Sequence, residues 1–443
     1  MARTLIKNAR LVNDGRTVEG DLLIEGERIA RVGGEIPAAD ATVVDGRGLL
    51  LAPGMIDDQV HFREPGLTHK ADLATESRAA VAGGITSFMD MPNTQPQTVT
   101  LEALEAKYAL AAGRTWGNHA FYLGATNDNI EEIRRLGRNQ TCGVKVFMGA
   151  STGNMLVDDP AVLDVLFRDV PTLLAAHCED TPTIHQNEIA FRAKYGDAVP
   201  IRFHPEIRSA EACWKSSSLA VELARRHDTR LHVLHLTTER ELELFRAGPP
   251  DGKHITAEVC IHHLWFDDRD YEERGTLIKC NPAVKTRTDR DALRAGLREG
   301  RLDLVGTDHA PHTLEEKARG YFGAPAGLPL VQHALPMLLE LVHDGHLPLE
   351  TAVEKFAHAP ARMFGIVDRG YLREGGYADL VLIDLDSAYQ VRREDVLYKC
   401  GWSPIEGQRL RSRVVATFVN GRKVYEEGQF LGGPAGQRLQ FER

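Results

Sequence analysis

Several side chains that can bind a metal or move a proton stand at the ends of apolar segments of this chain. A Gln-Val-His triplet at 59–61 follows one such segment, and two side chains two positions apart on a strand share a face. A lysine inside the apolar segment Gly143–Met148 is costly to bury as an ammonium, so we expect it to be neutral, paired or modified. Any one such residue is more often structural, but as a set of nitrogen and oxygen donors they predict a zinc site. The set is His61, Lys145, His177, His235 and Asp308.

Composition limits the partners that such a site can have. The chain has 443 residues, with 18 histidines, only 6 cysteines and a formal net charge of −10. This charge argues against nucleic acid or an anionic membrane as a partner. It does not exclude an anionic small molecule, because binding of such a ligand depends on the charges of the local pocket. The cysteines are scattered without a C-x-x-C pair, so we expect reduced thiols. Neither a signal peptide nor an apolar stretch of roughly 18 residues is found, which predicts a soluble, cytoplasmic protein.

The pattern between residues 54 and 366 supplies a scaffold for these side chains. Apolar strand-like segments alternate there with helical stretches such as Leu101–Ala112 and Ser209–His227. Eight strands alternating with helices are typical of a TIM-type (β/α)8 barrel, whose chemistry sits at the carboxyl ends of the strands. The expected strands are Gly54–Val60, Ile85–Met91, His119–Ala125, Gly143–Met148, Thr172–His177, Arg230–Leu236, His254–Cys260 and Leu302–Thr307.

Both ends of the chain are rich in short strands instead. Asn420-Gly421 lies between two apolar runs and predicts a tight hairpin turn, because both residues accept a positive φ. We therefore expect an α/β chain in which residues 1–53 and 367–443 form a small β-sandwich domain and residues 54–366 form the metal-dependent barrel. The expected terminal strands include Thr4–Val12, Asp21–Val32, Thr42–Leu51, Ala378–Leu385 and Val414–Val419.

The order of the metal-binding residue types along the barrel resembles the amidohydrolase superfamily. Four longer motifs resemble, more narrowly, the class I dihydroorotases. The resemblance covers essentially the whole chain, and the motifs are specific as a set. They are Val60-His61-Phe62-Arg63-Glu64-Pro65-Gly66, Met91-Pro92-Asn93-Thr94, Asn281-Pro282 and Thr307-Asp308-His309-Ala310-Pro311-His312.

The resemblance implies a zinc enzyme with one or two metal ions per chain. Carboxylation of Lys145 on its amine would give an anionic carbamate with one oxygen for each metal, and it would remove the cost of a buried ammonium. His177 and His235 would hold one zinc ion. His61 and Asp308 would belong to the other. A hydroxide from this centre would attack the ring amide, with Asp308 as general base and then acid.

The implied reaction is the reversible cyclisation of N-carbamoyl-L-aspartate to L-dihydroorotate in pyrimidine biosynthesis. Arg63 suits this substrate, because a guanidinium fork binds a carboxylate through two hydrogen bonds. Hydantoins and plain dihydropyrimidines lack that carboxylate. The alternative for Arg63 is a salt bridge with Glu64 or Asp58. The resemblance assigns substrate binding to Arg63, Asn93, Asn281, His312, Ala326 and Gly327.

One position departs from the family pattern. The first histidine of the H-x-H motif is Gln59 here, and an amide oxygen is a weaker zinc ligand than imidazole. We expect the His61/Asp308 side of the centre to be weak, differently ligated or empty, and the His177/His235 side to be firmly occupied. A single-metal enzyme stays chemically reasonable, because one zinc ion can both activate water and polarise a carbonyl.

Three functions stay open on the sequence alone: an active dihydroorotase, a related allantoinase or hydantoinase, and a non-catalytic paralogue that serves as a structural partner. Arg63 with Asn93 speaks against the neutral rings of the second. Gln59 favours the third, whereas the buried Lys145 among histidines speaks against it.

The sequence leaves the role of one histidine pair and the assembly undecided. His262 and His263 follow the seventh expected strand, where they either approach the site or serve the structure. Barrel enzymes of this size often form dimers or larger assemblies, so we expect a homo-oligomer that acts on a small molecule.

Overall fold

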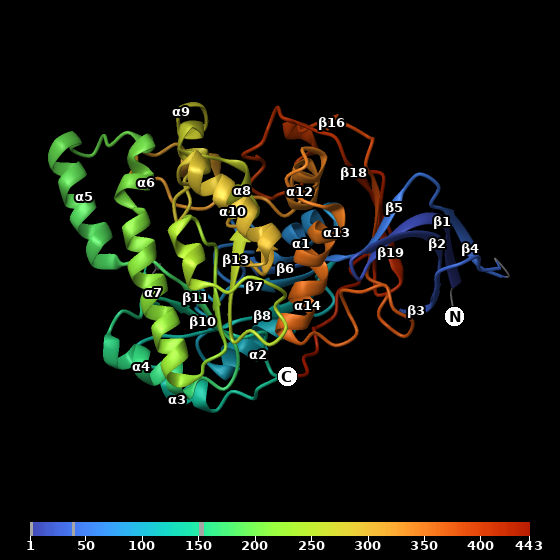
Figure 1. Cartoon of the computed structure of the whole chain (residues 1–443), viewed down its shortest axis with the longest axis horizontal. Helices are drawn as coiled ribbons and strands as arrows, with labels where there is room; N and C mark the ends of the chain where they lie inside the picture. Colours follow the sequence, from blue (N-terminus) through green and yellow to red (C-terminus); the bar gives the residue numbers. More distant parts are fainter. Residues whose placement is uncertain (1–2, 38–39, 150–154) are drawn as a thin grey trace.

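The chain forms a parallel barrel with a β-sheet domain at one side of it (Figure 1). The computed structural model describes residues 3–37, 40–149 and 155–443. The barrel occupies the middle of the sequence. Strands from both ends of the chain, blue and red in Figure 1, lie side by side at its right. The predicted fold class, a barrel with a β-domain built from both termini, is confirmed.

The eight predicted barrel strands are all present and pair in parallel. They are β6 (Met55–Val60), β7 (Ile85–Asp90), β8 (Asn118–Phe121) with β9 (Leu123–Gly124), β10 (Val144–Phe147), β11 (Leu174–His177), β12 (Leu231–Val233), β13 (Ile255–Cys260) and β14 (Leu304–Gly306). Hydrogen bonds join them in the orders β6-β7-β8 and β14-β13-β12-β11-β10-β9. The amide of His61 donates to the carbonyl of His309 at 2.7 Å, which links the first strand to the last.

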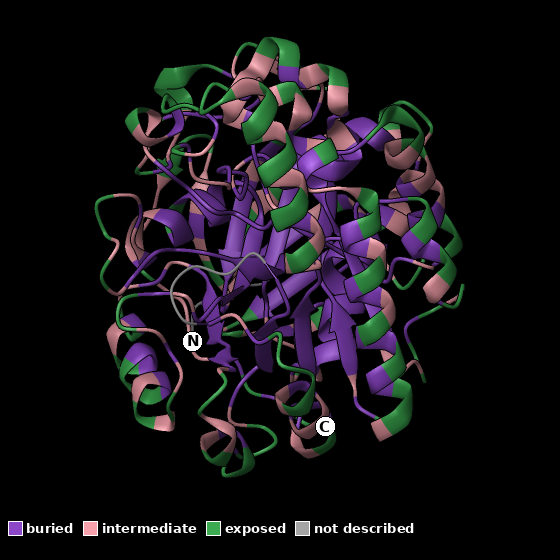
Figure 2. Ribbon diagram, turned by 90° about the vertical axis from the view of Figure 1, so that its left-hand side faces the viewer, coloured by how far each residue is buried: buried purple, intermediate pink, exposed green. Residues whose placement is uncertain are grey.

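Helices surround these strands and turn one face towards them. Figure 2 shows buried strands inside and helices whose outer faces are exposed. Ser209 begins the longest helix by accepting a hydrogen bond from the amide of Ala212, and Arg225 and Arg226 lie at the negative end of its dipole. The main helices are α1 (Leu73–Ala82), α2 (Leu101–Ala111), α4 (Pro160–Asp169), α5 (Thr181–Tyr195), α7 (Ala210–His227), α10 (Arg287–Glu299) and α12 (Ala334–His343).

Nine strands from the terminal segments form one sheet, in which the two ends of the chain interleave. The strands are β1 (Arg3–Asn13), β2 (Arg16–Glu25), β3 (Arg28–Val32), β4 (Thr42–Asp45), β5 (Leu50–Pro53), β15 (Leu380–Asp384), β18 (Arg413–Val419), β19 (Arg422–Glu426) and β20 (Gln429–Phe430). Their order is β20-β19-β18-β15-β5-β1-β2-β3, with β4 on β1. The predicted hairpin turn is present, with φ 50° at Asn420 and 74° at Gly421. The domain borders at 53/54 and 366/367 stay a prediction.

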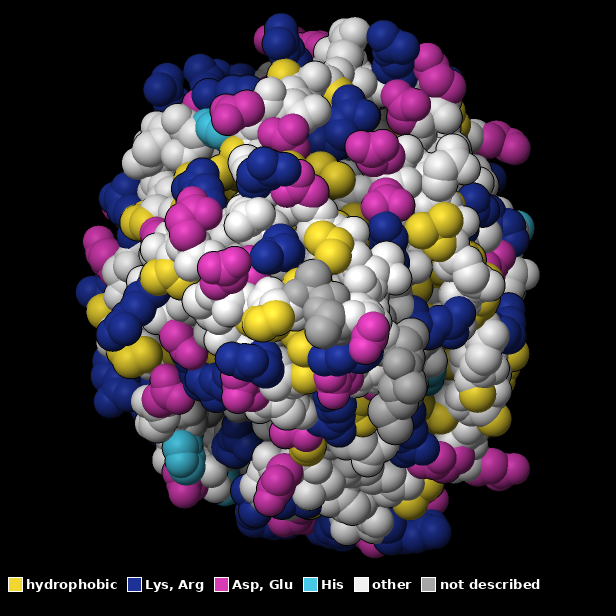
Figure 3. Space-filling model, turned by 90° about the vertical axis from the view of Figure 1, so that its right-hand side faces the viewer, with side chains coloured by type: hydrophobic (Ala, Val, Ile, Leu, Met, Phe, Trp, Pro, Cys, Tyr) yellow, Lys and Arg dark blue, Asp and Glu magenta, His cyan; other side chains and the backbone are white. Residues whose placement is uncertain are grey.

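The surface of the β-domain carries charges of both signs. Figure 3 looks onto this end of the molecule, where Lys and Arg side chains alternate with Asp and Glu without a field of one sign. This face therefore has no broad basic area for a polyanion. In the described part of the chain, no helix combines the length and the apolar character needed to cross a membrane.

Candidate metal centre and substrate site

The ends of β6 and β14 bring Gln59, His61 and Asp308 into contact. Nε2 of His61 lies 3.1 Å from Oδ1 of Asp308, and the amide nitrogen of Gln59 donates to the same oxygen at 3.3 Å. Asn93, which follows β7, places Oδ1 2.7 Å from Nδ1 of His61. Burial alone would raise the pKa of Asp308, but the hydrogen bond and charge of His61 outweigh it and hold this pKa below its usual value. The carboxylate is therefore available to accept a proton or a cation.

The ends of β11 and β12 bring two neutral histidines together. Nδ1 of His177 lies 2.9 Å from Nε2 of His235. Burial lowers the pKa of both rings, and that of His235 falls well below its ordinary value. Neutral imidazole is the form that binds zinc, so this pair presents ligands in the required state.

Glu179 is a site residue that sequence reasoning missed. Its Oε2 lies 3.0 Å from Nε2 of His177 and 2.7 Å from a guanidinium nitrogen of Arg208. Burial would raise its pKa, yet Arg208 and His177 lower it to about 2. A carboxylate behind a metal-binding histidine fixes the ring and its tautomer. The only signal in the sequence was its position two residues after His177.

Lys145 lies in β10 with 1% of its surface exposed. Among the residues that the structure describes, its Nζ has no hydrogen-bond partner, and it lies 4.5 Å from the ring centre of Phe147. Burial lowers its pKa to about 8, against the opposing pull of Asp308 and Glu258. A neutral amine is the form that reacts with carbon dioxide, and the lowered pKa increases the neutral fraction of Lys145.

Arg63 and His312 form the second half of the predicted site. Nε of Arg63 donates to the carbonyl of Pro311 at 3.1 Å, and its Nη2 lies 3.0 Å from Nε2 of His312. That same Nε2 lies 3.0 Å from the carbonyl of Ala326, while Nζ of Lys70 lies 3.0 Å from Nδ1. Burial lowers the pKa of Arg63 to about 10, which leaves the guanidinium charged at neutral pH.

The loop at Gly327 and the segment before Asn281 lie side by side. The amide of Gly327 donates to the carbonyl of Lys279 at 2.8 Å. Gly327 has φ 131°, and a Cβ there would lie 2.5 Å from the carbonyl oxygen of Ala310, so the position requires glycine. Within the described residues, Oδ1 of Asn281 is buried and has no partner, which leaves it free to bind a ligand.

Three predicted site residues have a left-handed backbone. The φ angles are 67° at Arg63, 41° at His235 and 45° at Asp308. Such a conformation costs a residue other than glycine about 1–3 kcal/mol and is typical of functional sites. The backbone at these three residues therefore places their side chains at a cost in local stability.

The two histidines after β13 differ in their contacts. Nε2 of His263 lies 3.1 Å from the carbonyl of Pro282, so this ring serves the structure. Both ring nitrogens of His262 are buried and have no partner in the described part of the chain. Cys260, His262 and His263 together form one of two groups of potential metal ligands found among the described residues.

The other group is Asp58, His232 and Glu258, all fully buried. Burial disfavours a charged His232, but the nearby carboxylates of Asp58 and Glu258 raise its pKa to about 9. Burial and the charge of Asp58 raise the pKa of Glu258 well above its ordinary value. Neither group contains a ligand predicted from the sequence.

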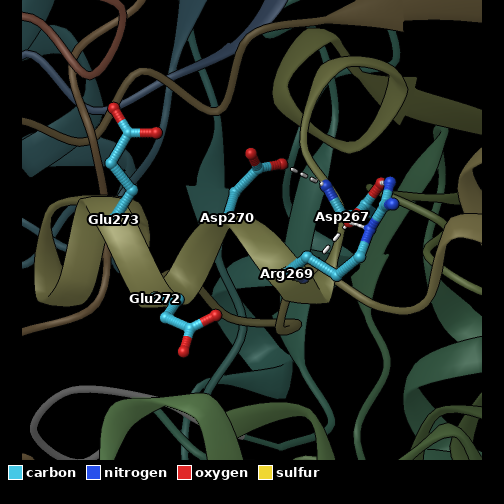
Figure 4. Close-up of a pocket in the computed structure, with 5 residues that line it drawn as sticks. All are labelled: Asp267, Arg269, Asp270, Glu272 and Glu273. Carbon is cyan, nitrogen blue, oxygen red and sulfur yellow. Dashed lines mark hydrogen bonds and ion pairs between the residues drawn. The ribbon is translucent and has the colours of Figure 1, made fainter.

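A surface hollow beside the short helix α9 (Tyr271–Arg274) offers no comparable chemistry (Figure 4). Its lining is acidic, but the carboxylate of Asp267 already pairs with Arg269 at 2.6 Å and with Arg290 at 2.8 Å. None of the predicted site residues lines it. The hollow is lined by Asp267, Arg269, Asp270, Glu272 and Glu273.

Comparison with known proteins places the whole chain in one family. Residues 50–424 match the amidohydrolase family. The dihydroorotase of Halobacterium salinarum is 34% identical over 434 residues, covering 94% of this chain and 96% of that relative. The dihydroorotase of Pediococcus pentosaceus is 32% identical over 432 residues, covering 96% of this chain and 99% of that relative.

Solved structures with the same fold carry different names. The L-hydantoinase of Arthrobacter aurescens has a TM-score of 0.92 at 27% identity and covers 99% of this chain and 100% of its own. The dihydropyrimidinase of Brevibacillus agri has a TM-score of 0.90 at 25% identity, with both chains fully covered.

The parallel barrel with histidines, a lysine and an aspartate at its strand ends defines a hydrolase that works with a metal. The chain belongs to the amidohydrolase family, within the group of metal-dependent cyclic amidohydrolases that comprises dihydroorotases and hydantoinases.

Proposed function

We propose that this enzyme is a zinc-dependent dihydroorotase, which interconverts N-carbamoyl-L-aspartate and L-dihydroorotate. The observation that carries the proposal is the buried, charged Arg63 beside His312, close to the His61/Asp308 pair. A guanidinium fork there binds the carboxylate that distinguishes dihydroorotate from the rings of hydantoin and dihydrouracil. The alternative pairing with Glu64 is not made, because Glu64 pairs with Arg114 at 3.0 Å.

The side chains at the strand ends fit a zinc centre. Nζ of Lys145 and Nδ1 of His235 are buried without partners within the described ranges, and both are the kind of atom that a metal or a carbamate would engage. Lys145, as a carbamate, would hold zinc together with His177 and His235. His61 and Asp308 would hold a second ion, with Gln59 as a weak ligand. Zinc bound there supplies hydroxide near neutral pH and polarises a carbonyl.

Asp308 is the residue that moves the proton in this proposal. Its carboxylate is ionised and held by His61, so in the direction of ring opening it accepts the proton of the attacking water. It then delivers that proton to the nitrogen that leaves the ring carbonyl. In the direction of cyclisation the same oxygen takes the proton from the carbamoyl nitrogen as it attacks the side-chain carboxyl carbon, and it returns the proton to the oxygen that departs as water.

The remaining polar groups orient the substrate. His312 is neutral, because burial and the charges of Arg63 and Lys70 hold its pKa well below the ordinary value. It therefore adds no charge beside a substrate, and it would bind one by exchanging a contact that a ring nitrogen makes with Arg63, Ala326 or Lys70. Asn93, Asn281 and the backbone of 326–327 supply further amide and carbonyl groups, which match the ring N–H and C=O groups of a dihydropyrimidine.

A hydantoinase is the second candidate, because the solved structures of L-hydantoinase and dihydropyrimidinase share the fold over the whole chain. Its substrates have neutral rings, which offer the buried guanidinium of Arg63 no carboxylate to bind.

The test is a spectrophotometric ring-opening assay with purified enzyme, supplied with zinc and bicarbonate, alongside a measurement of metal content. We expect turnover of L-dihydroorotate and little or none of allantoin and hydantoin. Turnover of hydantoin or allantoin in preference to dihydroorotate would refute the assignment.

A further inference from the structure

Three buried side chains from three barrel strands face one another, and none of them is used in the proposed reaction. Asp58 comes from β6, His232 from β12 and Glu258 from β13, and all three side chains are 0% exposed. One ligand atom from each lies within 4.8 Å of the others.

The distances between these atoms are too long for good hydrogen bonds. Nε2 of His232 lies 3.4 Å from Oδ2 of Asp58 and 3.6 Å from Oε2 of Glu258, whereas a hydrogen bond of this kind is usually about 2.7–3.2 Å. Two ligands on one tetrahedral zinc ion, each bonded at about 2.0–2.1 Å, lie about 3.3 Å apart. The observed separations therefore match the edges of a coordination polyhedron better than a hydrogen-bond network.

The converging atoms are also those without partners. In the described part of the chain, both carboxylate oxygens of Asp58, Oε2 of Glu258 and Nε2 of His232 accept or donate no hydrogen bond. The opposite ends of two of these side chains are fixed: Nδ1 of His232 lies 3.0 Å from Oγ1 of Thr256, and Oε1 of Glu258 accepts from the amide of His235 at 3.0 Å. Such outer contacts orient metal ligands.

Gly306 keeps the space between the ligands open. A Cβ at this position would lie 2.9 Å from Oε2 of Glu258 and 3.1 Å from Oδ1 of Asp58. The last barrel strand thus places no side chain where these oxygens converge.

We propose that Asp58, His232 and Glu258 bind a divalent transition-metal ion, with Zn²⁺ as the first candidate, at a site separate from the Lys145 centre. Two carboxylates and an imidazole are hard and borderline donors that suit such an ion. Its charge would offset both carboxylates once binding has displaced the protons that the cluster holds. The ion ties β6, β12 and β13 together, and through Glu258 it supports the backbone of His235.

The test measures zinc retained by the folded enzyme after exhaustive dialysis against a chelator. The buried ion should survive this treatment because no ligand is exposed, and zinc kept by the Lys145 centre counts equally in every variant. The variants are Asp58→Asn and, as a matched control, Asp57→Asn. Asp57 is equally buried but accepts a hydrogen bond from Oγ1 of Thr307 at 2.6 Å instead of joining the cluster.

The native protein and D57N should each retain about one zinc per chain more than D58N retains. A native chain without zinc after dialysis, or equal retention in D58N, overturns the proposal. If D58N fails to fold, zinc-edge anomalous scattering from crystals of the dialysed native protein tests the proposal without the variant. We expect a peak between Asp58, His232 and Glu258, and its absence from that place also overturns the proposal. Neither readout depends on catalytic turnover, so a failed activity assay leaves this result unaffected.

Discussion

The side-chain amide nitrogen of Gln59 donates to Oδ1 of Asp308 at 3.3 Å, the same oxygen that Nε2 of His61 contacts at 3.1 Å. Its oxygen, the atom that could bind a metal, lies 3.7 Å from Sγ of Cys260. Gln59 thus meets the proposed proton-transfer residue as a hydrogen-bond donor. A histidine at this position would present a ring nitrogen to a metal instead.

Replacing Gln59 with His should strengthen zinc binding at the His61/Asp308 side. Imidazole is a better zinc ligand than an amide oxygen. We therefore expect the affinity for zinc at the His61/Asp308 side to rise by at least about 10-fold. Titration of chelator-treated enzyme with zinc against a competing dye measures this. Equally tight zinc binding at the His61/Asp308 and His177/His235 sides of the native enzyme would contradict our account of Gln59. Superimposable zinc titration curves for native and Q59H would also contradict it.

Asp308→Asn should abolish turnover, because an amide cannot shuttle the proton. The expected loss in kcat is at least about 100-fold, within the range for a general acid–base residue. Near-UV circular dichroism checks that the fold is kept. A D308N enzyme within tenfold of the native rate would exclude Asp308 from proton transfer.

Arg63→Met should mainly weaken substrate binding. Loss of a charge-assisted pair costs about 2–4 kcal/mol, or about 30- to 900-fold in affinity for N-carbamoyl-L-aspartate. Arg63→Lys, which keeps the charge and loses the fork, should fall between native and R63M. Unchanged affinity in R63M would show that the carboxylate binds elsewhere.

Lys317→Met should disturb the loop that carries Ala326 and Gly327. Nζ of Lys317 donates to the carbonyls of Lys279, Pro325 and Gly327 at 3.0, 3.0 and 2.9 Å. Removing the donor that these three carbonyls share should reduce the free energy of unfolding by about 3 kcal/mol and raise KM more than it lowers kcat.

Denaturant unfolding and steady-state kinetics measure both effects of K317M. The exposed Lys194→Met serves as a control and should behave as the native enzyme. An unchanged KM in K317M would show that the loop carrying Ala326 and Gly327 does not contribute to substrate binding.

Much of the barrel could be predicted from local sequence. Its strands are buried on both faces, so they appear as short apolar runs such as Val144–Phe147, separated by amphipathic helices. The β-domain was harder. Nothing in Leu50–Pro53 specifies that β5 pairs with β15, near the other end of the chain, because sheet partners are chosen by tertiary packing.

The site residues, too, could be predicted from the sequence only in part. Strand-end residues such as His177 and Asp308 could be found because every barrel strand ends at the same face. The Asp58 cluster could not, since β6 has an irregular register between Asp57 and Val60, and simple alternation does not say which side chains point inward. The contact of Lys70 with His312 joins segments that the sequence gives no reason to connect.

The central claim is that this enzyme selects a carboxylated ring, and one comparison tests it most directly. L-Dihydroorotate and dihydrouracil share the ring and differ in the carboxylate that Arg63 is proposed to bind. We predict that kcat/KM for dihydroorotate exceeds that for dihydrouracil by at least about 30-fold, equivalent to about 2 kcal/mol, and that R63M removes this preference. Equal or greater kcat/KM for dihydrouracil in the native enzyme would contradict the account.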